Sequence, residues 1–177
     1  CDVAATVAQV TAITDAGADI VKFQTFKAKN LVTQNAEQAQ YQTENTQKQE
    51  SQLAMLSRLE LSYDTHHGLV DYCNQKGIEF LSTAFDSGSL NFLVNDLGIT
   101  RLKLPSGELT NAPLVLEHAL TGCDLIVSTG MATLSEIEMA LGVIAFGYID
   151  DGSARPSIQA FQEAYASLEG QQLLKQK

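Results

Sequence analysis

The sequence predicts an α/β protein in which about four parallel strand-helix units form part of a (β/α)8 TIM barrel. Short apolar runs alternate four times with amphipathic helical stretches after an opening helix, an order typical of a parallel sheet. Each run ends in polar side chains, as strands do at the active-site face of a barrel. No glycine-rich turn of the dinucleotide or triphosphate type follows any run, which argues against those folds.

Length and charge limit the possible functions. A complete barrel takes about 250 residues, so a chain of 177 residues is expected to be one incomplete barrel domain, 1–177, cut from a larger chain. Eleven basic and 21 acidic residues give a net charge of −10, which argues against nucleic acid and anionic membranes as partners. No apolar run approaches membrane-spanning length, and three scattered cysteines indicate reduced thiols. We expect a cytoplasmic protein.

The first unit carries the first candidate functional residues. Apolar residues recur at helical spacing over 3–16, and a strand follows over 20–25. Strand alternation places Lys22 and Gln24 on one face of this strand. Because Val21 and Phe23 flank Lys22, we favour a partly buried, functional lysine over a solvated one.

A polar stretch over 27–51 predicts a long loop with at most a turn of helix, and loops of this length are usually functional lids or disordered. Helices follow over 52–60 and from Ser62 as N-cap to Lys76, with Gly77 closing the second one. His66 and His67 lie near the start of that helix. Neighbours in sequence face different directions on a helix, so we expect a solvated pair rather than metal ligands.

Three further strand-helix units complete the chain. Ser87 is the expected N-cap of the second unit's helix, Asn111 of the third, and Thr133 forms a capping box with Glu136 in the fourth. His118 is expected to be structural. The expected strands are 78–83, 101–104 and 125–128, the helices end near 98, 122 and 147, and 148–177 holds a loop to 155 and then terminal helices.

The strand ends bring together the residues expected to do chemistry. They supply two lysines, one carboxylate, one amide and several hydroxyls, and the candidates are Lys22, Gln24, Thr83, Lys103, Ser106, Glu108 and Ser128. Two ammonium groups beside hydroxyls and helix N-termini form a local anion site in an acidic chain. The predicted guest is a phosphorylated or carboxylated small molecule.

Four motifs resemble the sialic acid synthase family, and the resemblance covers nearly the whole chain. They are Ala-Gly-Ala-Asp-Ile-Val-Lys-Phe-Gln-Thr-Phe (16–26), Gly-Ile-Glu-Phe-Leu-Ser-Thr-Ala-Phe-Asp (77–86), Lys-Leu-Pro-Ser-Gly-Glu (103–108) and Ser-Thr-Gly-Met-Ala-Thr (128–133). The chain departs from the family pattern at Ala84, where proline is common, and at Cys123 and Asp124, which replace lysine and proline.

The resemblance implies a transferase that condenses phosphoenolpyruvate with an N-acylated amino sugar of the N-acetylmannosamine type, giving a sialic acid and phosphate. Lys22, Lys103 and Glu108 take the catalytic positions by motif match. Thr83, Ser106 and Ser128, with the two lysines, would hold the phosphate or carboxylate of phosphoenolpyruvate. Gln24 and Glu108 would face the acceptor sugar.

The resemblance also implies parts that we expect to lie outside these 177 residues. The family has a further opening strand, three later strands and a small antifreeze-like domain, and it assembles as a homodimer. It uses a divalent metal such as Mn or Mg, whose ligands are expected outside this chain. We therefore expect the 177-residue chain alone to be inactive and to bind metal poorly.

Two other readings stay open. Lys22 or Lys103 on a barrel strand also suits a Schiff-base aldolase. A truncated barrel that only binds a sugar phosphate is the non-catalytic alternative. Within the synthase reading, the acceptor is N-acetylmannosamine, its 6-phosphate, or a diamino sugar that leads to legionaminic acid.

Overall fold

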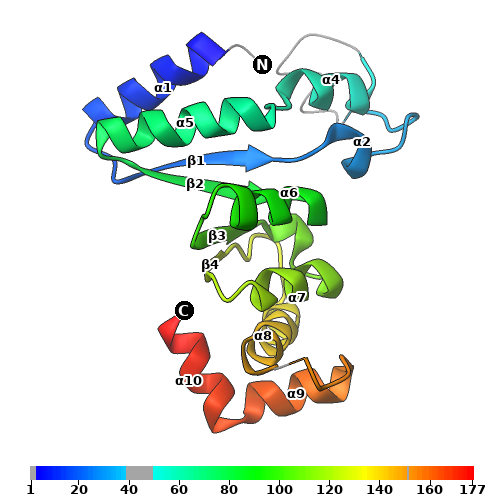
Figure 1. Ribbon diagram of the computed structural model, residues 1–177. Helices are drawn as coiled ribbons and strands as arrows, with labels where there is room; N and C mark the ends of the chain where they lie inside the picture. Colours follow the sequence, from blue (N-terminus) through cyan, green and yellow to red (C-terminus); the bar gives the residue numbers. More distant parts are fainter. Residues whose placement is uncertain (1–2, 39–49, 151) are drawn as a thin grey trace. The chain divides into compact units, whose positions relative to one another are not determined.

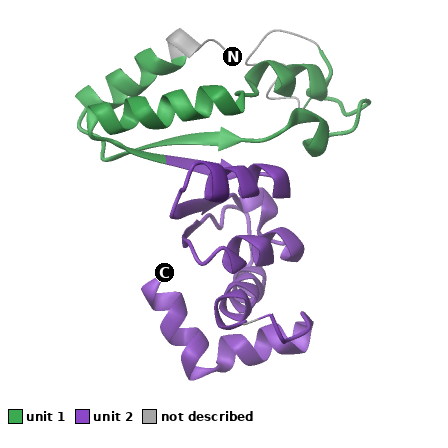
Figure 2. Cartoon of the chain, in the orientation of Figure 1, with its two compact units in different colours: residues 1–80 green, residues 81–177 purple. Residues whose placement is uncertain are grey.

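A computed structural model describes residues 3–38, 50–150 and 152–177 (Figure 1). The chain divides into two compact units, Cys1–Phe80 and Leu81–Lys177 (Figure 2). The boundary falls inside a strand, so each unit contains part of the sheet. Within the described residues, no helix has the length and apolar character that a membrane crossing requires.

The sheet has four strands in the order β1-β2-β3-β4, as the sequence predicted. Their bounds are β1 Ile20–Thr25, β2 Glu79–Ala84, β3 Arg101–Leu104 and β4 Asp124–Val127. β2 pairs with β3 and β3 with β4, both in parallel. Thr83 is the register partner of Lys103, and Lys103 is the partner of Ile126. This register aligns the polar strand ends of the second unit.

The first unit packs helices around β1 and the start of β2. The helices are α1 Val3–Asp15, α2 Ala28–Leu31, α4 Gln52–Leu59 and α5 Tyr63–Lys76. α1 contacts α5, where Val10, Leu69 and Cys73 are buried. α5 begins at the predicted Ser62 cap and ends at Gly77, whose φ of 71° suits glycine. Phe23 stacks on Phe80 with ring centroids 5.1 Å apart.

The loop expected over 27–51 contains a helical turn, α2, and its ends are held by polar contacts. The Glu60 carboxylate accepts hydrogen bonds from Lys27 Nζ at 3.0 Å and from the Ala28 amide at 2.9 Å. Lys27 Nζ also lies 4.2 Å from the centre of the Tyr63 ring. Further along, Glu37 forms an antiparallel bridge with Ser51. Residues 39–49 of this expected loop lie outside the described residues.

The second unit packs helices against β3 and β4. They are α6 Ser87–Asn91, a π-helix Phe92–Asp96, α7 Ala112–Leu120, α8 Leu134–Ile149, α9 Ile158–Ala166 and α10 Leu168–Gln176. Leu104, Val115, Val143 and Phe161 belong to one buried cluster between these elements. Gly142 lets α8 approach α9 closely, because an added Cβ would lie 2.9 Å from the carbonyl oxygen of Phe161. This core fixes the ends of β3 and β4.

Three boundary predictions were wrong in this unit. The N-cap of α6 is Asp86, whose carboxylate accepts from Ser89 N at 3.0 Å, whereas Ser87 is the first helical residue. The helix that was expected to run on to Gly98 changes to π geometry at Phe92, and this wider turn buries Phe92 and Leu93. α8 continues to Ile149 because the half-buried Tyr148 and Ile149 pack against the core. The loop therefore begins at Asp150.

Candidate active site

The C-terminal ends of β3 and β4 are joined by a charged hydrogen bond. Lys103 Nζ donates to Ser128 Oγ, and also to the carbonyl oxygen of Leu104 at 3.3 Å. Ser128 follows the last residue of β4, and its amide donates to the same Leu104 carbonyl at 3.0 Å. The Leu104 carbonyl oxygen thus accepts hydrogen bonds from both the Ser128 amide and the Lys103 ammonium. These two bonds hold the Lys103 ammonium and the Ser128 hydroxyl at the end of β3.

Alternation along β3 separates the ammonium from the core. Leu102 and Leu104 are fully buried, whereas Lys103 between them is only half-buried. Paired residues of neighbouring strands share a face, so Thr83 and Ile126 lie on the same face as Lys103. Thr83 is almost completely buried there. The lysine thus stands on the face of β3 that the helical core does not cover.

Ser106 lies against the loop that carries Ser128. It begins a single 3-10 turn, Ser106–Glu108, directly after Pro105 ends β3. A Cβ added to Gly130 would lie 3.5 Å from Ser106 Oγ, so the hydroxyl and the loop are in van der Waals range. Thr83, Lys103, Ser106 and Ser128 therefore occupy the ends of three neighbouring strands, and their binding of an anion stays a prediction.

Glu108 is held at the start of α7. Its Oε2 accepts a hydrogen bond from Asn111 Nδ2 at 2.8 Å, and Asn111 is the predicted N-cap of that helix. The carboxylate shares its turn with Ser106 and is half-buried. Its expected contact with an acceptor sugar stays a prediction.

Lys22 and Gln24 belong to the first unit. Both are exposed and alternate with the buried Val21 and Thr25, as the strand pattern predicted. The expected partial burial of Lys22 is wrong: Val21 turns to the opposite side of the strand, and Phe23 turns with it to stack on Phe80. Lys22 and Lys103 lie in different units, and their convergence on one anion stays a prediction.

The buried hydrogen bonds of His66 were not predicted, and its expected solvation is wrong. Its side chain is fully buried, while that of His67 is exposed. Nδ1 lies 2.8 Å from the carbonyl oxygen of Ser62 and must donate to it, which leaves Nε2 to accept from Thr25 Oγ1 at 2.9 Å. The inward position of Thr25 was the available signal, because a buried hydroxyl at a strand end needs a partner.

Burial sets the charge of this histidine. Desolvation lowers the pKa of His66, the charges of Lys27 and His67 lower it further, and the hydrogen bond to Ser62 offsets only part of this effect. His66 is therefore neutral near pH 7 and keeps an acceptor nitrogen for Thr25. This bond ties the end of β1, next to Gln24, to the first turn of α5.

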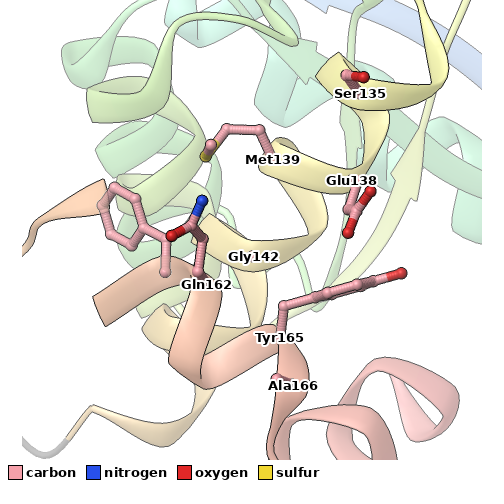
Figure 3. Close-up of a pocket in the computed structure, with 8 residues that line it drawn as sticks. Ser135, Glu138, Met139, Gly142, Gln162, Tyr165 and Ala166 are labelled. Carbon is pink, nitrogen blue, oxygen red and sulfur yellow. The ribbon is translucent and has the colours of Figure 1, made fainter. Parts of the chain in front are cut away.

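A hollow on the second unit lies away from the strand ends. It has a volume of about 320 Å³ and opens between α8 and α9, where Glu138, Met139, Gln162 and Tyr165 line it (Figure 3). None of the sequence-predicted site residues borders it. The polar strand ends remain the candidate active site.

The described residues provide no metal site. Among residues 3–38, 50–150 and 152–177, no three His, Cys, Asp or Glu side chains are placed to hold an ion. Two of the three histidines, His66 and His118, are buried with Nδ1 bonded to a helix carbonyl. These residues do not fit the divalent metal expected for the family, and no chemical step is assigned to a metal here.

The fold and the polar strand ends define a class of protein: an α/β protein of the parallel-barrel type with its polar groups at the C-terminal rim. A solved structure supports this class. The N-acetylneuraminic acid (sialic acid) synthetase of Leptospira borgpetersenii superposes with a TM-score of 0.70 over 83% of this chain and 46% of that one, at 24% sequence identity. The partial-barrel prediction is confirmed.

The chain belongs to the NeuB family, which it matches over residues 9–167. It is 47% identical over 135 residues, 76% of its length, to the N,N'-diacetyllegionaminic acid synthase of Legionella pneumophila. It is 48% identical over 130 residues, 73% of its length, to the synthase of the same name from Campylobacter jejuni. The chain spans 38% and 39% of the length of these two relatives. The predicted resemblance to sialic acid synthases is confirmed.

Proposed function

We propose that the protein to which this chain belongs condenses phosphoenolpyruvate with a diacetamido sugar and consumes one water, giving N,N'-diacetyllegionaminic acid and phosphate. The observation that carries the proposal is the hydrogen bond between Lys103 and Ser128 at neighbouring strand ends in a NeuB-family chain. The two curated relatives named above support the legionaminic product over N-acetylneuraminate.

The roles of the residues follow from their chemistry. Lys103 supplies the positive charge, and Ser128, Ser106 and Thr83 supply hydroxyl donors for the phosphate or carboxylate of phosphoenolpyruvate. Formation of the new carbon-carbon bond develops charge on the enol-derived carbon, and a fixed cation beside the anionic groups lowers that barrier without reorganisation. Lys22 would add a second cation, and Gln24 and Glu108 would orient the acceptor.

Kinetics of a full-length protein that carries this chain test the proposal. We expect phosphate release that requires both phosphoenolpyruvate and an acceptor, with kcat/KM for the diacetamido sugar above that for N-acetylmannosamine or its 6-phosphate. Lys103→Met should abolish turnover, whereas Lys175→Met, on exposed α10, should not. Phosphate release that needs no sugar, or a product without a nine-carbon sugar-acid chain, contradicts the proposal. The 177-residue chain alone is expected to give no turnover.

Borohydride trapping separates this reaction from the aldolase alternative. A Schiff-base enzyme incubated with pyruvate and borohydride becomes covalently labelled at its lysine. We expect no label at Lys103 or Lys22, and labelling at either lysine would favour the aldolase.

A further inference from the structure

The turn after β4 places a methionine in an unfavourable backbone conformation. Met131 has a φ of 63° and is the only non-glycine residue with a left-handed backbone in the part of the chain that the structure describes. The Ala132 amide donates to the Thr129 carbonyl at 3.1 Å, so Gly130 and Met131 are the two central residues of a tight turn. A positive φ at the second central position normally requires glycine or asparagine.

The Met131 side chain gains no packing that would offset this strain. It is fully exposed, although methionine is apolar and flexible. Neither the turn nor the core explains why methionine occupies this position. Residues held in sparsely populated conformations cluster at ligand clamps and active sites.

The turn borders the candidate active site on two sides. Ser128, which holds Lys103, directly precedes the turn. Gly130, inside the turn, lies in van der Waals range of Ser106. The strained residue is thus adjacent to three of the residues proposed to bind phosphoenolpyruvate, at the rim rather than at the floor of the site.

We propose that Met131 is a specificity-determining residue that contacts an N-acyl methyl group of the acceptor sugar. This inference rests on the proposed function. The ammonium and hydroxyl groups of Lys103, Ser106 and Ser128 suit the anionic substrate, to which an uncharged thioether offers nothing. The acceptor carries acetamido methyl groups, and a flexible apolar side chain at the rim buries such a group when the sugar binds.

The test compares variants of the full-length protein with N-acetyl and N-formyl forms of the acceptor. Met131→Gly removes the side chain and suits the φ of 63°, so it should unfold at a higher temperature than wild type. Both Met131→Gly and Met131→Ala should raise the acceptor KM about tenfold, change the phosphoenolpyruvate KM less than about twofold, and abolish the preference for N-acetyl over N-formyl. Leu134→Ala, an equally apolar and exposed change at the start of α8, should do none of these.

Three outcomes overturn the inference. An active enzyme in which Met131→Gly keeps the wild-type acceptor KM and N-acyl preference excludes the contact. An acceptor KM raised as much by Leu134→Ala as by Met131→Ala excludes a specific role for Met131. A wild-type protein that consumes no acceptor overturns the proposed function itself, and with it the inference, so the two failures are distinguishable.

Discussion

Lys103 donates a hydrogen bond to Ser128 across the ends of two parallel strands, and both groups also converge on the carbonyl of Leu104. The geometry fixes a flexible lysine side chain before any substrate arrives. Preorganised charge of this kind is more effective than charge that must be ordered during the reaction.

Removing the hydroxyl should weaken the site without unfolding it. In the full-length protein, Ser128→Ala should lower kcat/KM for phosphoenolpyruvate by about 10- to 100-fold, because a hydrogen bond to a charged group contributes about 1.5 to 3 kcal/mol. Ser135→Ala, exposed on α8 at the border of the surface hollow, is the control and should leave the rate unchanged. If Ser135→Ala lowered the rate and Ser128→Ala did not, the hollow rather than the strand ends would be the functional site.

His66 and its neighbour should differ sharply in their contribution to stability. His66→Ala should lower the free energy of unfolding by about 2 to 4 kcal/mol, because it opens a cavity and leaves Thr25 Oγ1 without this acceptor. His67→Ala removes an exposed side chain and should change it by less than about 0.5 kcal/mol. Urea unfolding of the 177-residue chain measures the change in the free energy of unfolding for each variant. Equal effects would show that the bond from His66 to Thr25 does not stabilise the unit.

Stability should fall as the pH drops below the ordinary histidine range. Burial lowers the pKa of His66 and of His118, and in His118 it outweighs the hydrogen bond to Leu114 and the nearby charges of Glu117 and Glu108. At pH values between the ordinary histidine pKa of 6.5 and the lower pKa of the folded state, the unfolded chain therefore binds more protons than the folded chain. The two histidines favour folding fully above that pH, and this contribution is lost as the pH falls toward their lower folded-state pKa values.

A variant of His118 tests this pH dependence. Its Nε2 is buried without a hydrogen-bond partner, so His118→Leu removes a titrating group and leaves few broken contacts. The free energy of unfolding of His118→Leu, measured between pH 7 and pH 5, should fall less steeply than that of wild type. An unchanged slope would mean that His118 is as easily protonated in the folded chain as in the unfolded one.

Two glycines in helix interiors should respond to alanine with opposite signs. Gly142→Ala pushes a methyl group against the Phe161 carbonyl and should destabilise the second unit by about 1 to 3 kcal/mol. Gly68→Ala in α5 meets nothing within 4 Å and should stabilise the first unit by about 0.4 to 1 kcal/mol. The denaturant midpoint of each variant, compared with that of wild type, shows whether the substitution stabilises or destabilises the chain. A stabilising Gly142→Ala would rule out the close approach of α8 to α9.

Local signals predicted the elements well because they act within a few residues. The caps at Ser62, Asn111 and Thr133 satisfy amide groups of the same turn, and the structure has all three. Alternation in β3 likewise separated Lys103 from the buried leucines. The predicted Ser87 cap failed for a local reason too, since Asp86 offers a carboxylate one residue earlier.

The sequence by itself determined the strand-helix order, the polar strand ends and the family. The spacing of apolar residues and the short sequence motifs can be read from the order of the residues, without any knowledge of tertiary contacts. Only the tertiary structure decided that Thr83 and Ile126 flank Lys103 in register, that Lys103 is bound by Ser128, and that His66 is buried against a threonine 41 positions away. Each of these contacts joins residues far apart in sequence. Their free energy depends on the packing of whole strands and helices, which no short pattern specifies.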